Sequence, residues 1–501
     1  MESRILIRQA LVLVDAARAP LSQSDILIEQ DQIVAIAPHL VAPDAQEIDA
    51  SGLLIAPGLV NGHFHSHEHF HKGRYDNLPL KLWMHYVRLP VAPPPLTPEQ
   101  VYYRTLIGAV ESIRTGTTFV VDDVNHAPYF SADCIDAVFR AYEDIGLRAL
   151  VSVSLFDQPF YRSVPFFDEE MPEPLRQLLD RQASPQAADL LVLAESLAES
   201  RRGKRVGSIV APSAPQRCSD RFLKQLKDLA DRSDLPMMTH LLETRLQAVT
   251  GGILYGQSMA EQLEALGVLS DRLVLQHCIW LTSDDVQRLA AHGCSVVYNP
   301  LSNLKLGSGR MAVRQFLDAG VNVALASDGC GSRDSLNMLS VMQAAALLNK
   351  APLELPEQWL SAQDAFSLAT LGGAKAFGHA ETLGRLAPGY QADLVGYRLS
   401  SAAFTPLNNP VNQLVYAETG SAVDLVMIEG KVIMSNGTLR TMDEYTIIQN
   451  INSIHCQILA ELNRAEASVN KFLPYYRKIY ERCLQESVNP KIITPDNSNN
   501  S

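Results

Sequence analysis

The chain has 501 residues, of which 47% are hydrophobic and 19% charged, as in a folded globular protein. Its formal net charge is −13 and no lysine- and arginine-rich block occurs, which argues against a nucleic-acid or anionic-membrane surface. The seven cysteines are scattered without a Cys-x-x-Cys pair, so neither a disulfide scaffold nor a cysteine zinc knuckle is indicated. The start lacks a signal-peptide pattern and no apolar run reaches about 18 residues, so we expect a cytoplasmic protein.

Both ends of the chain carry short runs in which apolar and polar residues alternate, the pattern of antiparallel strands. Such runs fill residues 4–56, and a hairpin over residues 423–434 turns at Glu429-Gly430. We therefore predict one small β-sandwich domain that combines residues 1–57 with residues 385–442.

Residues 58–384 alternate apolar strand candidates with amphipathic helical stretches. Several of these strands are apolar throughout, as expected in a parallel sheet that is buried on both faces. Eight strands are the number that closes a (β/α)₈ barrel of the TIM type, so we predict an α/β barrel domain. The strand candidates are 59–65, 118–121, 148–154, 206–211, 237–240, 273–277, 295–298 and 321–326. A longer excursion, residues 155–205, is expected to cover the barrel mouth.

After residue 441 the apolar residues recur at helical spacing, from Ile447 through Tyr476. This predicts a C-terminal helical extension over residues 443–490 that packs on a neighbouring domain or another subunit. Its apolar surface favours a homodimer or a higher homo-oligomer over a monomer. Residues 491–501 offer little to bury, so we expect a disordered tail.

The stretch from Pro57 to His71 contains five histidines at alternate positions. His63 and His65 are two residues apart on a predicted strand, so their side chains leave the same face. Two imidazoles on one face can bind one metal ion at about 2.0–2.1 Å per nitrogen. Buried core histidines or a loose surface chelator remain the alternatives for this stretch taken alone.

Three further polar residues stand where later strands end: His240, His277 and Asp328. The carboxyl ends of barrel strands meet at one rim, where barrel enzymes have their active sites. We therefore expect these residues to converge with His63 and His65. A single strand-end histidine more often caps a loop, but the combination predicts a metal site. Imidazoles with one carboxylate suit Zn²⁺ or Fe²⁺ better than Ca²⁺ or Mg²⁺.

Five motifs in this order span the predicted barrel. They are Pro57-Gly-Leu-Val-Asn-Gly-His-Phe-His, Thr239-His240-Leu-Leu-Glu243, Gln276-His277, Asn299-Pro-Leu-Ser-Asn303 and Ser327-Asp328-Gly329. Together with residues 383–394 and 428–431 they resemble the amidohydrolase superfamily. Within it they look most like the branch of cytosine deaminase, S-adenosylhomocysteine/methylthioadenosine deaminase and the triazine hydrolases.

The resemblance implies a role for each motif residue. The implied metal ligands are His63, His65, His240 and Asp328. His277 would polarise the metal-bound water or the developing tetrahedral oxygen, and Glu243 would carry a proton to a ring nitrogen and then to the leaving group. Asp328 would also take the proton of the attacking water. A solvated carboxylate at the start of a helix is the alternative for Glu243.

The number of metal ions follows from a departure within the superfamily. Two-metal members place a carbamylated lysine at the end of the fourth strand. Residues 206–214 read Val-Gly-Ser-Ile-Val-Ala-Pro-Ser-Ala and contain no lysine. We therefore predict one zinc ion per subunit, with iron as the alternative.

Substrate contacts are expected from loops around the mouth: His67, Arg74, Asp76, Trp83, Phe156 and Ser332. Structural roles are an equal alternative for Arg74, Asp76 and Trp83, and a hydrophobic loop core for Phe156. Asn299 and Asn303 are expected to hold the seventh loop through bonds from side chain to backbone.

These features predict a metal-dependent aminohydrolase that attacks an amidine-like carbon of a nitrogen heterocycle and releases ammonia. As an alternative, the same site would act on a guanidino, cyclic-urea, chloro- or alkylamino-substituted substrate, with ring closure as one outcome. An inactive structural relative is a third reading, against which the retained metal ligands argue. The expected partner is a small molecule, with neither nucleic acid nor a membrane.

Overall fold

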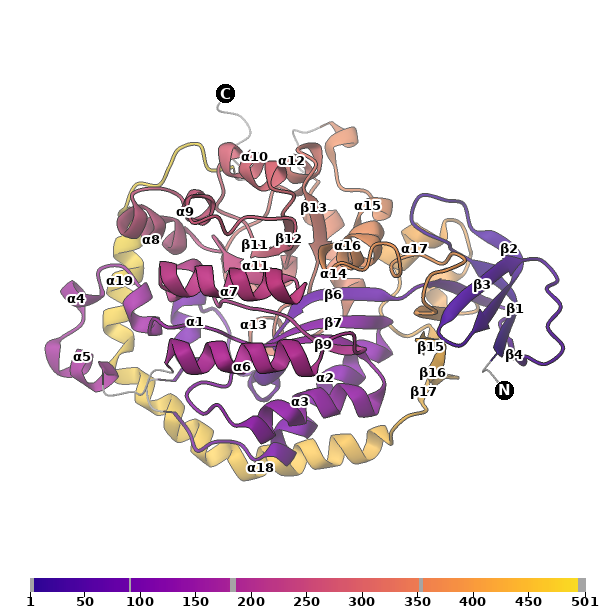
Figure 1. The fold of residues 1–501 in the computed structure, drawn as a ribbon, viewed down its shortest axis with the longest axis horizontal. Helices are drawn as coiled ribbons and strands as arrows, with labels where there is room; N and C mark the ends of the chain where they lie inside the picture. The colour runs from indigo at the N-terminus through magenta and orange to yellow at the C-terminus, as the bar shows by residue number, and fades with distance from the viewer. Residues whose placement is uncertain (1–3, 90–91, 181–185, 351–354, 494–501) are drawn as a thin grey trace.

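The computed structural model describes residues 4–89, 92–180, 186–350 and 355–493. A barrel forms the larger body of the molecule, and a sheet built from both chain ends lies beside it (Figure 1). The eight barrel strands are parallel and form two hydrogen-bonded runs, β6-β7-β8-β9 and β10-β11-β12-β13. Their bounds are β6 Leu59–Phe64, β7 Thr117–Val124, β8 Arg148–Val153, β9 Val206–Ser208, β10 Met237–Leu241, β11 Leu273–His277, β12 Ser295–Tyr298 and β13 Asn322–Leu325.

Backbone hydrogen bonds join the two runs into a closed barrel. The amide of Met238 donates to the carbonyl of Val210 at 2.9 Å, which connects the first run to the second. The amide of Asp328 donates to the carbonyl of His63 at 3.0 Å, which closes the last seam. The predicted barrel class is confirmed, and the final seam joins two of the predicted metal ligands.

Several of the helices that surround the barrel begin at a residue whose side chain caps the helix. Thr97 and Gln100 form a reciprocal capping box at the start of α2, and the Ser219 side chain caps α7. The helices between the strands are α1 Leu80–Val87, α2 Pro98–Arg114, α3 Ala132–Ile145, α4 Phe167–Glu170, α5 Glu173–Asp180, α6 Ala187–Ser200, α7 Asp220–Ser233, α8 Arg245–Tyr255, α9 Met259–Ala265, α10 Ser283–Ala291, α11 Pro300–Lys305, α12 Val313–Asp318, α13 Cys330–Arg333, α14 Met338–Leu348, α15 Ala362–Ser367 and α16 Gly373–Ala376.

The terminal strands join in one continuous nine-stranded sheet. β5 lies between β1 from the N-terminal end and β14 from the C-terminal end, so each end of the chain completes the other. Apolar side chains from both ends, among them Ile7 and Met427, share one core. The strands are β1 Arg4–Val12, β2 Leu21–Glu29, β3 Gln32–Ala37, β4 Gln46–Asp49, β5 Leu53–Pro57, β14 Leu394–Arg398, β15 Val423–Ile428, β16 Lys431–Ser435 and β17 Thr438–Leu439, with α17 Pro410–Tyr416 between β14 and β15.

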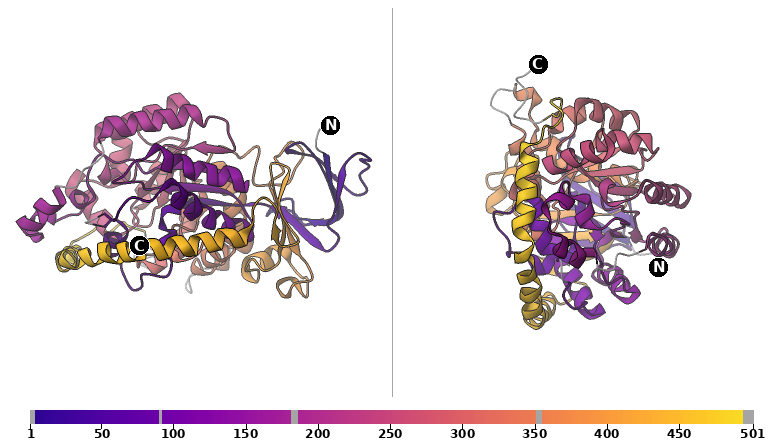
Figure 2. Two further views of the ribbon diagram at one scale, coloured as in Figure 1. Left: turned by 90° about the horizontal axis from the view of Figure 1, so that it is seen from below. Right: turned by 90° about the vertical axis from the view of Figure 1, so that its left-hand side faces the viewer.

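The C-terminal extension consists of α18 (Glu444–Ala467) and α19 (Leu473–Gln485), which run along the underside and the end of the barrel (Figure 2). α18 lies against α2, and α19 contacts α1, α4 and α8. These last three helices follow the carboxyl ends of β6, β8 and β10, so α19 covers the barrel mouth. The apolar face that suggested a second subunit therefore packs on the barrel of the same chain.

The expected disorder from residue 491 onward is wrong for the first three residues of that tail. Ile492 is buried, and the Ile493 amide donates to the Leu281 carbonyl at 2.9 Å. Residues 494–501 lie outside the described residues. In the described ranges, no helix has the length and apolar character needed to span a bilayer.

Candidate active site

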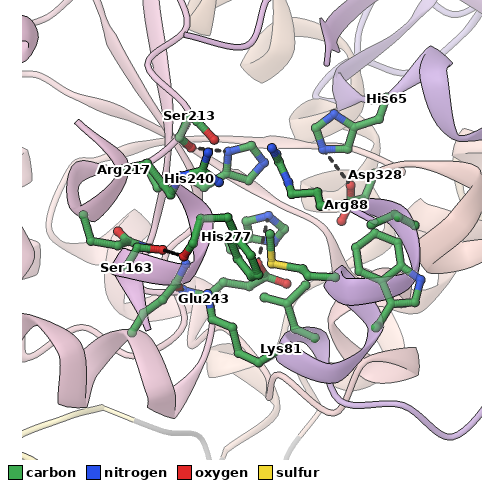
Figure 3. Close-up of a pocket in the computed structure, with 18 of the residues that line it drawn as sticks. His65, Lys81, Arg88, Ser163, Ser213, Arg217, His240, Glu243, His277 and Asp328 are labelled. Atoms are coloured by element: carbon green, nitrogen blue, oxygen red, sulfur yellow. Dashed lines mark hydrogen bonds and ion pairs between the residues drawn. The ribbon is translucent and has the colours of Figure 1, made fainter. Parts of the chain in front are cut away.

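Four imidazoles and one carboxylate converge at the carboxyl-terminal rim of the barrel. Figure 3 labels His65, His240, His277 and Asp328 among them. Ring nitrogens of His63, His240 and His277 lie within 4.8 Å of one another, as do the ligand atoms of His63, His65 and Asp328. The Asp328 Oδ1 atom lies 3.5 Å from His65 Nε2 and 3.9 Å from His63 Nε2. The strand-end residues that the sequence singled out are thus brought together.

The strand ends turn sharply to present these side chains. His277 is the last residue of β11 and has φ 70°, and Asp328, after β13, has φ 63°. Residues other than glycine rarely adopt such left-handed conformations, which cost about 1–3 kcal/mol and occur preferentially at functional sites. Gly329 follows because a Cβ atom there would lie 2.0 Å from Glu68 Oε2.

Two of the histidines are oriented by backbone carbonyls. His65 Nδ1 lies 2.7 Å from the Asp123 carbonyl, and His240 Nδ1 lies 2.7 Å from the Ser213 carbonyl. A carbonyl can only accept, so Nδ1 carries a hydrogen, and Nε2 is the nitrogen left to bind a metal ion. This is the usual arrangement of metal-binding histidines. Asp123 and Ser213 were not predicted, because backbone partners leave no signal in the sequence.

The chemistry of the rim fits a divalent cation. Both ring nitrogens of His63 are buried and have no hydrogen-bond partner in the described part of the chain, which is costly unless a ligand satisfies one of them. Burial lowers the pKa of His65, but the carboxylates of Glu68 and Asp328 raise it by more than burial lowers it, so the pKa is about 9. The rim therefore attracts positive charge.

Asp328 is held as an ionised carboxylate. Burial raises its pKa, but His65, His277 and hydrogen bonds outweigh that effect, so the pKa lies below its usual value. The Ser302 hydroxyl donates to Oδ2 at 2.6 Å, and the Gly329 amide donates to Oδ1 at 2.7 Å. An ionised carboxylate in this place can bind a metal ion or accept a proton.

Glu243 and His277 face each other beside the imidazole group. Glu243 Oε2 lies 3.7 Å from His277 Nε2, and the Ser308 hydroxyl donates to Oε1 at 3.2 Å. Burial raises the pKa of Glu243, which favours its protonated form. Asn303 Nδ2 donates to His277 Nδ1 at 2.8 Å, so Nε2 carries the ring hydrogen and points toward Glu243. Asn303 therefore orients His277, whereas the sequence predicted a bond to the backbone for it.

A cavity of about 70 Å³ opens beside these residues. It is lined by His65, His240, Glu243, His277 and Asp328 and by residues of α1 and of the turn that ends at Arg217. His67 and Trp83 are among the lining residues, as expected for substrate contacts. His67 Nδ1 accepts from the Asn125 amide at 3.1 Å, so its Nε2 is the donor. Trp83 is buried and donates from Nε1 to the Gly331 carbonyl at 3.1 Å.

The other predicted substrate contacts do not line this cavity. Arg74 turns to α18 and binds Glu466 with two hydrogen bonds, at 3.0 and 2.7 Å. Asp76 is exposed on the loop before α1. Phe156 packs on the guanidinium of Arg217, whose carbon lies 4.3 Å from the ring centroid. The Ser332 hydroxyl donates to the Gly329 carbonyl at 2.9 Å and so shapes the turn after Asp328.

Four charged residues that line the cavity were not predicted: Glu68, Lys81, Arg88 and Arg217. Glu68 is buried in the turn Ser66–His71 that follows β6, and its pKa is raised to about 7, chiefly by burial. Lys81 interrupts the apolar run Leu80–Met84 of α1, a signal that the sequence did carry. Arg217 ends the turn Pro215–Arg217 in the loop after β9, so it lies beyond the strand end and lacks the signal that marked the histidines.

The family model described as "Amidohydrolase family" matches residues 54–433. The 5'-deoxyadenosine deaminase of Methanothermobacter thermautotrophicus is 34% identical over 428 residues, 85% of this chain and 93% of the relative. The 5-methylthioadenosine/S-adenosylhomocysteine deaminase of Nitratidesulfovibrio vulgaris is 33% identical over 92% of this chain and 99% of its own.

Solved structures of enzymes with related activities have the same fold as this chain. An adenosine deaminase from Xanthomonas campestris with bound zinc has a TM-score of 0.80 and 30% identity, covering 91% of this chain and 99% of its own. An atrazine chlorohydrolase from Arthrobacter aurescens complexed with zinc has a TM-score of 0.81 and 25% identity, covering 90% and 100%. The resemblance seen in the five motifs is confirmed. This chain belongs to the amidohydrolase family.

Proposed function

We propose that this protein is a metal-dependent aminohydrolase that releases ammonia from an amidine-like carbon of a nitrogen heterocycle. The observation that carries the proposal is the position of Glu243, a buried carboxyl group with a raised pKa, 3.7 Å from His277 beside the imidazole group. The relatives named as deaminases of 5'-deoxyadenosine and of methylthioadenosine support this reaction type.

The proposed metal is one zinc ion per subunit, held by His63, His65, His240 and Asp328. When bound, zinc acts as a Lewis acid that lowers the pKa of a water molecule toward about 7. Zinc in the adenosine deaminase and atrazine chlorohydrolase structures supports this choice over iron. The absence of a lysine in residues 206–214 supports a single ion.

The side chains then divide the proton transfers among themselves. The ionised carboxylate of Asp328 accepts the proton of the attacking water. Glu243, whose pKa is raised by burial, acts in its protonated form: it donates to a ring nitrogen and makes the adjacent carbon electrophilic. The Nε2 hydrogen of His277 is aimed at the charge that develops on the attacking oxygen. As the carbon–nitrogen bond breaks, the ionised Glu243 takes the remaining hydrogen of the attacking oxygen and passes it to the departing ammonia. The proton held by Asp328 then restores the protonated form of Glu243.

Ammonia release tests the proposal directly. Zinc-loaded protein is assayed with aminopurine nucleosides, aminopyrimidines, pterins and aminotriazines, before and after removal of metal by a chelator. We expect ammonia from at least one of these classes, loss of activity in metal-free protein and recovery when zinc returns. Undiminished turnover by fully metal-free protein would contradict the proposal.

A second candidate keeps the site and changes the leaving group. The likeness to an atrazine chlorohydrolase favours displacement of chloride or an alkylamine, and the same chemistry could act on a guanidino or cyclic-urea compound. Mass spectrometry of the products distinguishes these reactions, since chloride, alkylamine and ammonia leave different mass changes. Chloride release from chlorotriazines without ammonia release from the amino compounds would favour the second candidate.

A further inference from the structure

Three basic side chains line the cavity beside the imidazole rim (Figure 3). Lys81 comes from α1, Arg88 ends that helix, and Arg217 ends the short turn after β9. Lys81 is 6% exposed and Arg217 is 4% exposed, while Arg88 is partly exposed. Removing cations from water costs several kcal/mol each unless an anion or hydrogen bonds compensate.

The compensation that the protein supplies is incomplete. None of the three forms an ion pair with a carboxylate anywhere in the described chain. Arg217 donates from Nε to the Gln158 carbonyl at 3.1 Å, but its Nη1 is buried without a partner. Two aromatic rings hold the guanidinium in place, at 4.3 Å (Phe156) and 5.5 Å (Phe160) from their centroids. These rings position the charge and leave a donor unused.

Nearby carboxylates act on two of the cations more than on the third. Glu68 and Asp123 attract Arg88, and Glu243 attracts Lys81. Arg217 has no such carboxylate, and both burial and the positive charge of Arg88 lower its pKa. Burial and the two arginines likewise lower the pKa of Lys81, to about 8, against the pull of Glu243. The cations therefore repel one another in a buried space, with Arg217 the least compensated.

We propose that Lys81, Arg88 and Arg217 form a subsite for an anionic group, so that the heterocyclic substrate carries a carboxylate, sulfonate or phosphate. This inference rests on the proposed function and narrows its substrate class. Glu243, Lys81 and Arg217 line the same cavity (Figure 3), so a ring that reaches Glu243 can present an acidic substituent to the two cations. The charges also disfavour a purely cationic guanidino substrate, which would add a further positive charge.

Matched ligand pairs test the subsite. Dissociation constants are measured by calorimetry for cytosine-5-carboxylate against its carboxamide, pterin-6-carboxylate against pterin, and adenosine-5'-carboxylate against adenosine. Zinc-loaded Glu243→Gln protein is used so that the ligands are not consumed. For at least one pair we expect the anionic member to bind about tenfold or more tightly, because charged hydrogen bonds are worth that much. Equal binding within every pair would overturn the subsite.

Variants assign any preference to Arg217. Arg217→Gln should reduce the ratio within the pair to near one, and Arg217→Lys should restore part of it. Arg221→Gln makes the same charge change on the exposed face of α7 and should leave the ratio unchanged. If Arg217→Gln does not fold, Lys81→Gln is used instead and should likewise lower the ratio of the two dissociation constants. A ratio that survives both Arg217→Gln and Lys81→Gln would contradict the proposal.

A second measurement does not depend on the heterocycle. Selenate soaked into crystals of the zinc-loaded wild-type enzyme is located by anomalous scattering. A peak between Arg217 and Lys81 is expected, and its absence would also overturn the subsite. The ammonia assay separates the two proposals: anion binding without ammonia from any compound leaves the subsite standing and counts against the aminohydrolase. Ammonia release from neutral compounds, with no tighter binding of the anionic member of any pair, supports the aminohydrolase and counts against the subsite.

Discussion

The barrel rim and the cover above it place their functional residues in different ways. Each rim residue belongs to a strand or directly follows one, and the barrel hydrogen bonds fix it, as in the bond between Asp328 and the His63 carbonyl. The cover consists of α1, the turn at Arg217 and α19, and contacts between distant segments hold it together. His85 of α1 stacks on Tyr476 of α19, with ring centroids 3.4 Å apart.

This difference separates reaction from selectivity. The rim holds the imidazoles and carboxylates that a hydrolytic reaction of this family needs, whatever the substrate. The cover supplies Lys81 and Arg217, which line the cavity. In our proposal they bind the part of the substrate that does not react. Variants of the rim should therefore abolish turnover, whereas variants of the cover should change which compounds bind or how firmly the cover is held.

The largest effect is expected from a metal ligand. His240→Ala removes one imidazole whose orientation depends on the Ser213 carbonyl. We expect loss of bound zinc and a fall in kcat/KM of about 10⁴-fold or more, since a bound metal supplies several kcal/mol to the transition state. Metal analysis of the purified variant checks the cause. Full zinc content with wild-type turnover would show that His240 is not a ligand.

Glu243→Gln should follow in size. The amide cannot move a proton to the ring or to the leaving group, so kcat should fall by about 10²–10⁴-fold. Zinc content should stay unchanged, because Glu243 contacts His277 and lies outside the proposed ligand set. Steady-state kinetics and metal analysis together check this prediction, and a variant with normal kcat would exclude the proton-carrying role.

Asn303→Ala should have a smaller effect on turnover. It removes the hydrogen bond that orients His277, and partners of this kind are worth about 10–100-fold. The loss should appear in kcat, with the circular dichroism spectrum and the zinc content unchanged. A loss confined to KM would mean that Asn303 acts on substrate binding instead.

The sequence allowed the rim to be predicted because strand ends are local signals: an apolar run stops and a polar residue follows. The eight strands and the convergence of His63, His65, His240, His277 and Asp328 all depend on that pattern. The cover gave no such signal. The sequence predicted that Arg74 contacts the substrate. In the structure Arg74 binds Glu466, which lies 392 residues later in the chain, and it does so away from the cavity.

The contact between Arg74 and Glu466 should affect stability and its pH dependence. Burial raises the pKa of Glu466, but hydrogen bonds from Arg74 and Tyr75 lower it to below its ordinary value. The resulting stabilisation is present above the unfolded-state pKa and is lost as the pH falls through the folded-state pKa. Glu466→Gln should therefore cost about 1–3 kcal/mol at neutral pH, and this difference should shrink as the pH falls below the ordinary glutamate pKa of about 4.3.

Urea unfolding at several pH values measures this effect. Glu461→Gln, on the same helix and paired with Arg464 at the surface, is the matched control and should change stability by less than about 1 kcal/mol. A difference between Glu466→Gln and wild type that persists unchanged into acid would show that the ion pair is not its source.

The smallest effect is expected from Asp76→Asn. Asp76 is exposed and its carboxylate accepts from the neighbouring Asn77 amide, so the substitution changes charge without reaching the cavity. We expect kcat/KM within about twofold of wild type, since surface substitutions change free energies by about 0.5 kcal/mol or less. A much larger loss, measured against the same substrate, would return Asp76 to the list of substrate contacts.

The central claim is that imidazoles and a carboxylate from separate barrel strands bind one catalytic ion. Anomalous diffraction at the zinc edge, from crystals of the zinc-loaded protein, tests this claim most directly. The account predicts a single strong peak within ligand distance of the Nε2 atoms of His63, His65 and His240 and of the Asp328 carboxylate. An absent peak, or a peak elsewhere in the protein, would contradict it.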